Sequence, residues 1–262
     1  MRALVRHEFE ERLRDRWVLV VTALFVMLSA GVGLYGRSAG ESAAAVTAPS
    51  IVTLAALLVP LVALVLGHDA IVGERERHTL GLLLSLPVGR GEVLLAKFLG
   101  RAMALVLSIV LGLGSAIIVL DAEQASVLVQ LLPSTLLLGA AFLSIGMFLS
   151  TMARRHATAA SLSVAVWFLF VFFYDLGILA ALIITDGALS TQAVADMVLV
   201  NPAGLYRTEM LVRLGAGSGL ENLGVDVVLP GAMLRTLLWA CWIVVPQAAG
   251  AFLLRSRRAV QS

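Results

Sequence analysis

The sequence predicts an all-α membrane protein in which residues 1–262 form a single domain with six transmembrane helices. Of the 262 residues, 60% are hydrophobic and only 14% are charged, and the mean hydropathy is +0.98. Soluble domains are about 45–50% apolar and about 25% charged, so the composition argues against a water-soluble enzyme or a nucleic-acid-binding module. The apolar residues also fall into six long runs, and the basic residues gather in alternate links between these runs.

Each run is close to or above the roughly 20 residues that a helix needs to cross a bilayer. No alternation of the kind found in barrel strands competes with this assignment. The third and fifth runs are long enough to tilt or break. In order, the predicted spans are Trp17–Tyr35, Ile51–Gly67, Val93–Leu120, Val127–Thr151, Ala159–Thr185 and Arg235–Leu254.

The basic residues predict the orientation of the spans. Fifteen of the 19 Lys and Arg residues lie before span one, around the link from span two to three, between spans four and five, or after span six. Because cytoplasmic loops of membrane proteins are enriched in Lys and Arg, we expect both termini to be cytoplasmic. The basic pI then follows from this distribution without any nucleic-acid partner.

Residues 1–16 predict an amphipathic helix before the first span. Val5, Phe9, Leu13 and Trp17 recur every four residues and form one helical stripe, with Arg and Glu residues on the opposite face. Such a helix lies in the membrane interface with its apolar face in the acyl boundary. The alternative is a solvated extension of span one.

The link from span two to three contains the most informative stretch, GERERHTLGLLLSLPVGRGEVLLAK, residues 73–97. We expect a short helix over Glu74–Ser85, with Leu80, Leu83 and Leu84 on one face, ended by Pro87. This leucine face suits docking into a partner's groove, but it equally suits an ordinary loop helix buried against the membrane.

The segment between spans five and six, residues 186–234, is the longest polar region of the chain. It mixes glycines with apolar residues such as Met197, Leu199 and Met210, which predicts short amphipathic helices on the outer surface. These helices form either a platform for another protein or a cap on this chain alone.

The sequence contains few residues for chemistry. It has no phosphate-binding loop and only one lysine, Lys97, so we expect no ATP hydrolysis by this chain. The single cysteine and four scattered histidines predict no metal site. Asp175 is the one acid well inside a span, which makes it a candidate for the transport pathway or an outer gate, with Tyr174 as hydrogen-bond partner. Alternatively, Gly177 breaks the helix and Asp175 caps a second segment.

The 73–91 loop resembles the first cytoplasmic loop of ABC-2-type permeases, the membrane subunits of ABC exporters. The shared pattern is an acidic start, a Thr-Leu pair, a leucine pair, a proline, a basic residue and a lysine that opens span three. His78 stands where the family often has glycine, so we expect the first turn to differ. The matching residues are Glu74, Glu76, Thr79, Leu80, Leu83, Leu84, Pro87, Arg90 and Lys97.

This resemblance implies that the 73–91 helix is a coupling helix seated on a separate ATPase subunit, which would bind ATP and Mg while this chain carries no cofactor. It also implies a second, smaller ATPase contact around Arg154 and Arg155. Both segments would lie at the cytoplasmic face of the bacterial inner membrane. The chain itself is then a permease and not an enzyme.

Four further stretches are similar to a group of ABC-2 permeases that serve copper-site assembly of nitrous oxide reductase. Gly204 departs from the acidic residue of that pattern. The stretches are RDRWVLVVTALF (14–25), HDAIVGE (68–74), VWFLFVFFYDL (166–176) and NPAGLYR (201–207).

This narrower resemblance implies a homodimer with spans two and five at the seam, two ATPase copies, and a periplasmic accessory protein that contacts Asn201, Pro202, Tyr206 and Arg207. The transported species would be sulfur- or copper-related. Two alternatives remain: a generic exporter of lipid, drug or polysaccharide, and a mechanotransmitting membrane scaffold that moves no substrate of its own.

Overall fold

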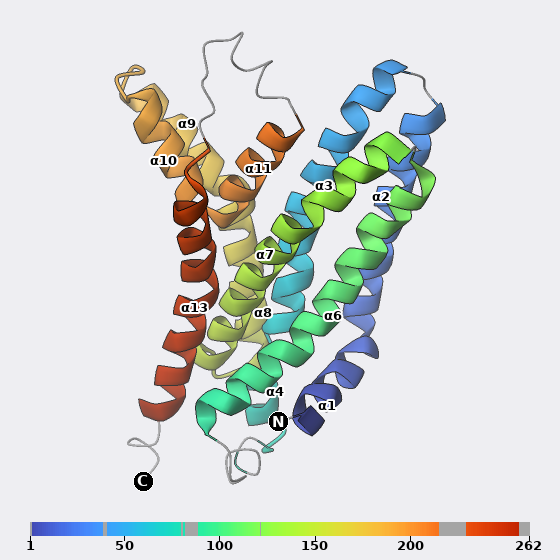
Figure 1. Ribbon diagram of the computed structural model, residues 1–262. Coiled ribbons are helices and arrows are strands. Elements are labelled where there is room, and N and C mark those ends of the chain that lie inside the picture. Colours follow the sequence, from blue (N-terminus) through green and yellow to red (C-terminus); the bar gives the residue numbers. More distant parts are fainter. Residues whose placement is uncertain are drawn as a thin grey trace.

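The computed structural model describes residues 2–38, 41–79, 81, 89–120, 122–214 and 229–256. Every regular element in these ranges is a helix, and the long helices stand side by side as a bundle (Figure 1). Six are long and apolar enough to cross a membrane, which confirms the six-span prediction. They run over Arg16–Ser38, Thr47–Glu76, Gly91–Val119, Leu128–Met152, His156–Ile184 and Ala232–Leu254.

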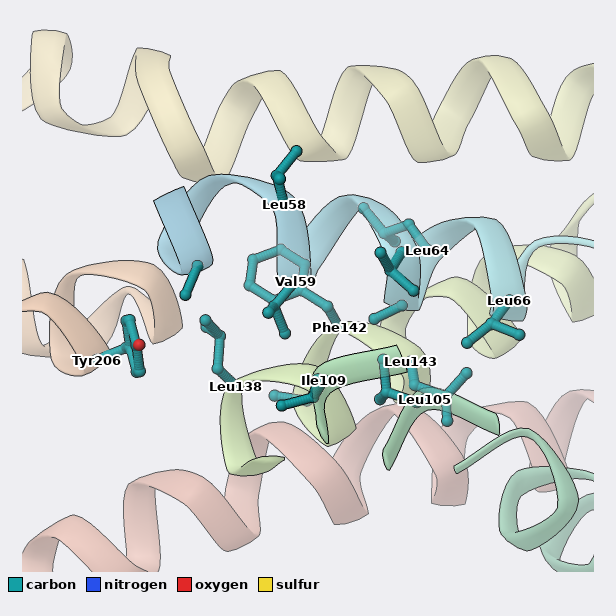
Figure 2. Close-up of a cluster of buried hydrophobic side chains, with 14 of the residues drawn as sticks. Leu58, Val59, Leu64, Leu66, Leu105, Ile109, Leu138, Phe142, Leu143 and Tyr206 are labelled. Carbon is teal, nitrogen blue, oxygen red and sulfur yellow. The ribbon is translucent and has the colours of Figure 1, made fainter. Parts of the chain in front are cut away.

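Each of the first four spans contains one long α-helix, and the helices of spans two and four begin several residues before the apolar runs expected from the sequence. They are α2 (Arg16–Ser38), α3 (Glu41–Gly67), α6 (Arg90–Val119) and α7 (Ala122–Met152). The helix α3 is the centre of the bundle: 67% of the residues in its apolar window are buried, against 6% in the fifth span. The core lies between α3, α6 and α7, around Val59, Ile109 and Phe142 (Figure 2).

Two glycines let α3 and α7 approach each other closely. A Cβ atom on Gly67 would lie 2.9 Å from the backbone nitrogen of Met147, and a Cβ on Gly146 would lie 3.2 Å from the Cα of Gly67. Small residues at such crossings allow the backbones of membrane helices to pack directly. This contact fixes the end of α3, from which the chain enters the loop around residues 73–91. The sequence predicts that this loop contacts an ATPase, and we call it the coupling loop.

The coupling loop begins with a short helix, α4 (Val72–Glu76), and its turn includes His78 with φ +58°. This left-handed residue ends the helix, so the continuous helix expected over Glu74–Ser85 is wrong at its start. Four residues of the expected ATPase-facing helix, Leu80, Leu83, Leu84 and Pro87, lie outside the described residues.

The fifth span consists of α8 (His156–Phe168), a π-helix η1 (Leu169–Phe173) and α9 (Tyr174–Ile184). The helix continues through Gly177, so the expected break at that glycine is wrong. The irregular turn lies earlier, at η1. Asp175 lies in the first turn of α9, and the residue at the cap position is Phe173, so Asp175 does not cap a second segment.

Two helices, α10 (Thr191–Val200) and α11 (Pro202–Arg213), follow the fifth span, as the sequence predicts. The helix α11 reaches into the bundle and packs against α3 and α7. The last span is α13 (Ala232–Ser256), which returns to the end of the bundle where α1 (Arg2–Leu13) lies (Figure 1).

Candidate functional site

Six charged side chains meet at the end of the bundle where α1 and α4 lie (Figure 1). Three are carboxylates and three are cations, so their formal charges balance. They come from α1, from the turn after α3, from α4 and from α6, and we call them the charge cluster. Its members are Glu8, Arg12, Asp69, Glu74, Lys97 and Arg101.

Asp69 bridges two arginines in the middle of the cluster. Its Oδ2 atom lies 2.8 Å from Nη1 of Arg12, and its Oδ1 atom lies 2.6 Å from Nη1 of Arg101. Glu8 pairs with Lys97 and lies 3.3 Å from Nη2 of Arg101. The cations are deeply buried, with Lys97 0% and Arg101 1% exposed. Buried charges are costly unless they are paired. The charged side chains of each helix can therefore be buried only because other elements supply their partners.

Glu74 connects the cluster to the coupling loop. Its Oε1 atom lies 3.0 Å from Nζ of Lys97, and its Oε2 atom accepts a hydrogen bond from the hydroxyl of Thr79. The backbone N–H of Thr79 also donates to the carbonyl of Glu74 at 3.0 Å. The predicted coupling residues Glu74 and Thr79 are therefore bonded to each other and, through Lys97, to α6.

Glu76 connects the coupling loop to the fifth span. Its Oε1 atom accepts the backbone N–H of His156 at 2.7 Å, and Arg75 donates to the carbonyl of Ala153. The neighbouring Arg154 and Arg155 are exposed in the turn between α7 and α8. The two segments expected to contact the ATPase are therefore held together as one surface.

The helix α1 lies against α6 because Gly100 leaves room for it. A Cβ atom on Gly100 would lie 2.6 Å from the Cβ of Glu8 and 2.7 Å from the carbonyl oxygen of Val5. The polar face of α1 was expected to lie opposite the packing stripe, yet it buries Glu8 and Arg12 against the spans. The reason is that α6 and the end of α3 present ions of the opposite sign.

At the rim of the cluster, Glu11 links α1 to the residue after α4. Its Oε1 atom lies 3.1 Å from Nη1 of Arg77 and 3.0 Å from Nη2 of Arg12. Burial alone would raise the pKa of the Glu11 carboxyl, but the two arginines outweigh burial and lower it. The hydrogen bond to Glu11 in turn raises the pKa of Arg77. Both groups therefore stay charged and hold α1 to the coupling loop.

A second constellation is built around η1, near the middle of the fifth span. A π-turn leaves a backbone carbonyl without its usual helical partner, and the carbonyl of Phe170 accepts the side-chain amide of Asn201 at 2.8 Å. Just after this turn, Oδ2 of Asp175 lies 2.6 Å from Nη1 of Arg207. The hydroxyl of Tyr174 donates to the carbonyl of Met197 at 2.7 Å. The partner of Asp175 is therefore Arg207, not Tyr174 as expected.

Three of the four residues expected to meet a periplasmic protein are buried. Asn201 and Pro202 begin α11, and Asn201 caps it through the N–H of Ala203 at 3.0 Å. The buried hydroxyl of Tyr206 lies 3.1 Å from that of Thr135 in α7. Arg207 is partly exposed. As placed, Asn201, Pro202 and Tyr206 shape α11 within the bundle, so a partner would meet them only indirectly.

The comparisons with known proteins agree with this architecture. A family model described as ABC-2 family transporter protein matches residues 2–258. The chain belongs to the ABC-2 transporter family. It is 38% identical to a protein of Pseudomonas aeruginosa named "Probable ABC transporter permease protein NosY", over 95% of this chain and 94% of the relative. A protein of the same name from Stutzerimonas stutzeri is 37% identical, over 92% of this chain and 93% of the relative.

This ABC-2 permease is the membrane subunit of an ABC transporter and lacks the ATPase domain. A permease of this kind works with a partner ATPase, and the surface around α4 is the one that the sequence predicts to contact it. Within that surface, sequence reasoning identified Glu74, Glu76 and Thr79.

Most of the charge cluster of this ABC-2 permease was missed by sequence reasoning. One signal was available: Lys97 and Arg101 are spaced i, i+4 at the start of an otherwise apolar helix, so they share a face. Two like charges on one face of a membrane helix require acidic partners. The sequence did not reveal that α1 supplies one of them, Glu8. It also did not reveal that the rings of His68 and His156 meet edge to face, with centroids 4.8 Å apart.

Proposed function

We propose that this chain is the NosY-like permease of a NosDFY-type transporter in the bacterial inner membrane. In this proposal a homodimer with cytoplasmic termini binds a NosF-like ATPase dimer at the α4 end and a NosD-like periplasmic accessory protein at the α11 end. The transporter exports or delivers a sulfur- or copper-related species for copper-site assembly of nitrous oxide reductase. The observation that carries the proposal is the identity of 38% to a NosY-named permease over 95% of the chain.

The charge cluster supports a coupling mechanism for this transporter. Closure of the ATPase on ATP displaces the coupling loop, and the bonds from Glu74 to Lys97 and from Glu76 to His156 carry that displacement to α6 and α8. The helix α1 moves with them along the cytoplasmic membrane surface, because Glu8 pairs with Lys97. The two nucleotide states can drive this motion only through different contacts with the loop.

We place the homodimer seam on the fifth span. Only 6% of the residues in its apolar window are buried within the protomer, and its exposed side chains include Phe172, Leu176 and Leu179. The second span, also expected at the seam, is enclosed by its own protomer over most of its length. The seam therefore consists of the fifth span, with α3 behind it. Asp175, in the second half of this span, and its partner Arg207 on α11 serve as an outer gate.

The experiment replaces Glu74 by Arg, which puts a cation beside Lys97 and breaks the link from the loop to α6. In cells that express nitrous oxide reductase, we expect the Glu74→Arg transporter to assemble and hydrolyse ATP while copper loading of the reductase falls. Glu10→Arg is the matched control, because Glu10 pairs only with Arg6 on the exposed face of α1 in the described part of the chain.

Two outcomes would contradict the proposal. Full copper loading with Glu74→Arg would show that the charge cluster does not couple the two processes. Full copper loading in a strain without this chain would show that the permease serves another pathway.

A further inference from the structure

A pocket of about 400 Å³ lies between α7, α11 and α13, at the end of the bundle opposite the charge cluster. The pocket opens on the side of the bundle, between residues of two membrane spans, and two of its lining residues, Leu137 and Val244, are exposed. Its lining residues include Leu137, Glu209, Arg235, Thr236, Trp239 and Val244.

Two polar groups in the wall of this pocket lack partners. Glu209 is 5% exposed and Trp239 is 4% exposed. Neither Oε2 of Glu209 nor Nε1 of Trp239 has a hydrogen-bond partner among the residues that the structure describes. A buried polar group without a hydrogen bond is costly. One acceptor and one donor that are both unsatisfied indicate a ligand that carries both kinds of group.

The charge of the pocket indicates the sign of that ligand. Oε1 of Glu209 lies 2.8 Å from Nη2 of Arg213 and 3.8 Å from Nη1 of Arg235. Among the described residues, one carboxylate between two guanidinium groups leaves one net positive charge, so an anionic ligand restores the balance. Arg235 lines the pocket, and a guanidinium group is well suited to bind a phosphate.

An apolar hollow lies next to the pocket. It has a volume of about 450 Å³, lies between α6 and α7, and shares Leu137 with the pocket. Its other lining residues are all apolar and include Leu105, Val106 and Leu136. Because Leu137 lines both hollows, the apolar hollow lies beside the pocket, and we call the two together the groove.

We propose that this groove binds an anionic phospholipid, phosphatidylglycerol. Its phosphate contacts Arg235 and the indole N–H of Trp239, and a hydroxyl of its glycerol headgroup donates to Oε2 of Glu209. One acyl chain lies in the hollow between α6 and α7. The net positive charge favours this lipid over zwitterionic phosphatidylcholine, whose headgroup also lacks a donor for Glu209. The site is independent of the species that the transporter moves.

The test measures phosphatidylglycerol that stays with the purified permease after exchange into phosphatidylcholine nanodiscs. We expect wild-type protein to retain it, Arg235→Gln to lower its affinity about tenfold, and Trp239→Phe to lower it several-fold, as loss of one hydrogen bond to a charged group would. Trp239→Phe keeps the aromatic ring, so it tests the site even if Arg235→Gln fails to fold. Arg37→Gln, at an exposed arginine away from the groove whose Nη1 donates to the carbonyl of Val119, should retain the lipid.

Three results would overturn the proposal. Equal retention of phosphatidylglycerol and phosphatidylcholine by the wild type would show that no headgroup is recognised. An equal loss in Arg37→Gln would show general attraction to surface charge. Displacement of the lipid by glycerol phosphate alone, at concentrations equal to those of the lipid, would show a site for a soluble phosphate compound.

Discussion

At the scale of single residues, Asp69 holds the charge cluster together because it is the shared partner of Arg12 and Arg101. Asp69→Asn keeps the shape of the side chain but leaves two guanidinium groups without their anion. Removing one member of a buried ion pair typically costs about 3–5 kcal/mol, so we expect a clear fall in the melting temperature of the purified permease.

The matched control for Asp69→Asn is Glu10→Gln on α1. The Glu10 side chain is 53% exposed and its partner Arg6 is 81% exposed, so water compensates the loss of that pair. We expect the melting temperature of Glu10→Gln to equal that of the wild type. If the two variants melted at the same temperature, the burial of the cluster would have no energetic consequence.

His78 is a residue whose backbone conformation suits glycine. It has φ +58° in the turn after α4, and the left-handed region costs a non-glycine residue about 1–2 kcal/mol. Histidine therefore adopts here the left-handed conformation that glycine favours, and the expected difference between this turn and that of the family stays a prediction. We expect His78→Gly to raise the free energy of unfolding by about 1 kcal/mol or less, because the entropy of glycine offsets part of the gain.

His78→Val is the counterpart, because a β-branched side chain is strained at positive φ. We expect chemical denaturation to give the highest free energy of unfolding for His78→Gly, an intermediate value for the wild type and the lowest for His78→Val. The reverse order would show that His78 makes a favourable contact that outweighs its backbone strain.

At the scale of elements, the contact between α1 and α6 depends on the absence of a side chain at Gly100. Gly100→Leu would push α1 from the bundle, since backbone atoms of α1 lie where the new side chain must go. We expect hydrogen–deuterium exchange over residues 2–13 to become faster. Gly114→Leu on the same helix is the control, because nothing lies within 4 Å of a Cβ there; equal exchange in both variants would contradict this account of the packing.

The spans could be predicted from the sequence, while the charge cluster largely could not. The third span was expected over Val93–Leu120 and runs over Gly91–Val119, since a membrane helix is specified by the apolarity of its own residues. The cluster instead joins residues far apart in the chain: Lys97 and Glu8 are 89 positions apart, and Arg101 and Asp69 are 32 apart. Pairs of this kind depend on tertiary packing, which hydropathy and periodicity do not encode.

Gly204 shows the same limit for a single position. In the NPAGLYR stretch, glycine stands at a position where the pattern of the similar permeases has an acidic residue. A Cβ atom there would lie 2.3 Å from the carbonyl oxygen of Val198, so the close approach of α11 to the end of α10 requires glycine. The departure therefore has a packing reason, which only the relation between the two helices reveals.

At the scale of the whole molecule, the exposed fifth span predicts where the two copies of the proposed homodimer meet. In a two-fold dimer, a residue near the axis faces its own copy. In a Cys241→Ser background, needed because Cys241 is exposed, we expect Leu179→Cys to form a disulfide-linked dimer in oxidised membranes. Leu111→Cys on α6 should not, although the two leucines are similarly exposed at 52% and 49%. Cross-linking of Leu111→Cys without cross-linking of Leu179→Cys would show that the two copies meet at α6 instead.

Lys97 gives the folded permease an unusual chemical property. It is the single lysine of the chain, and it is enclosed beneath α1 by Glu8 and Glu74. Reagents that acylate primary amines should therefore spare this subunit's side chains while they modify the lysines of whatever assembles with it. If α1 lifts away at some stage of the working cycle, the amine of Lys97 loses its partner Glu8 and becomes accessible to the reagent. The extent of acylation at this one peptide would then report when α1 moves.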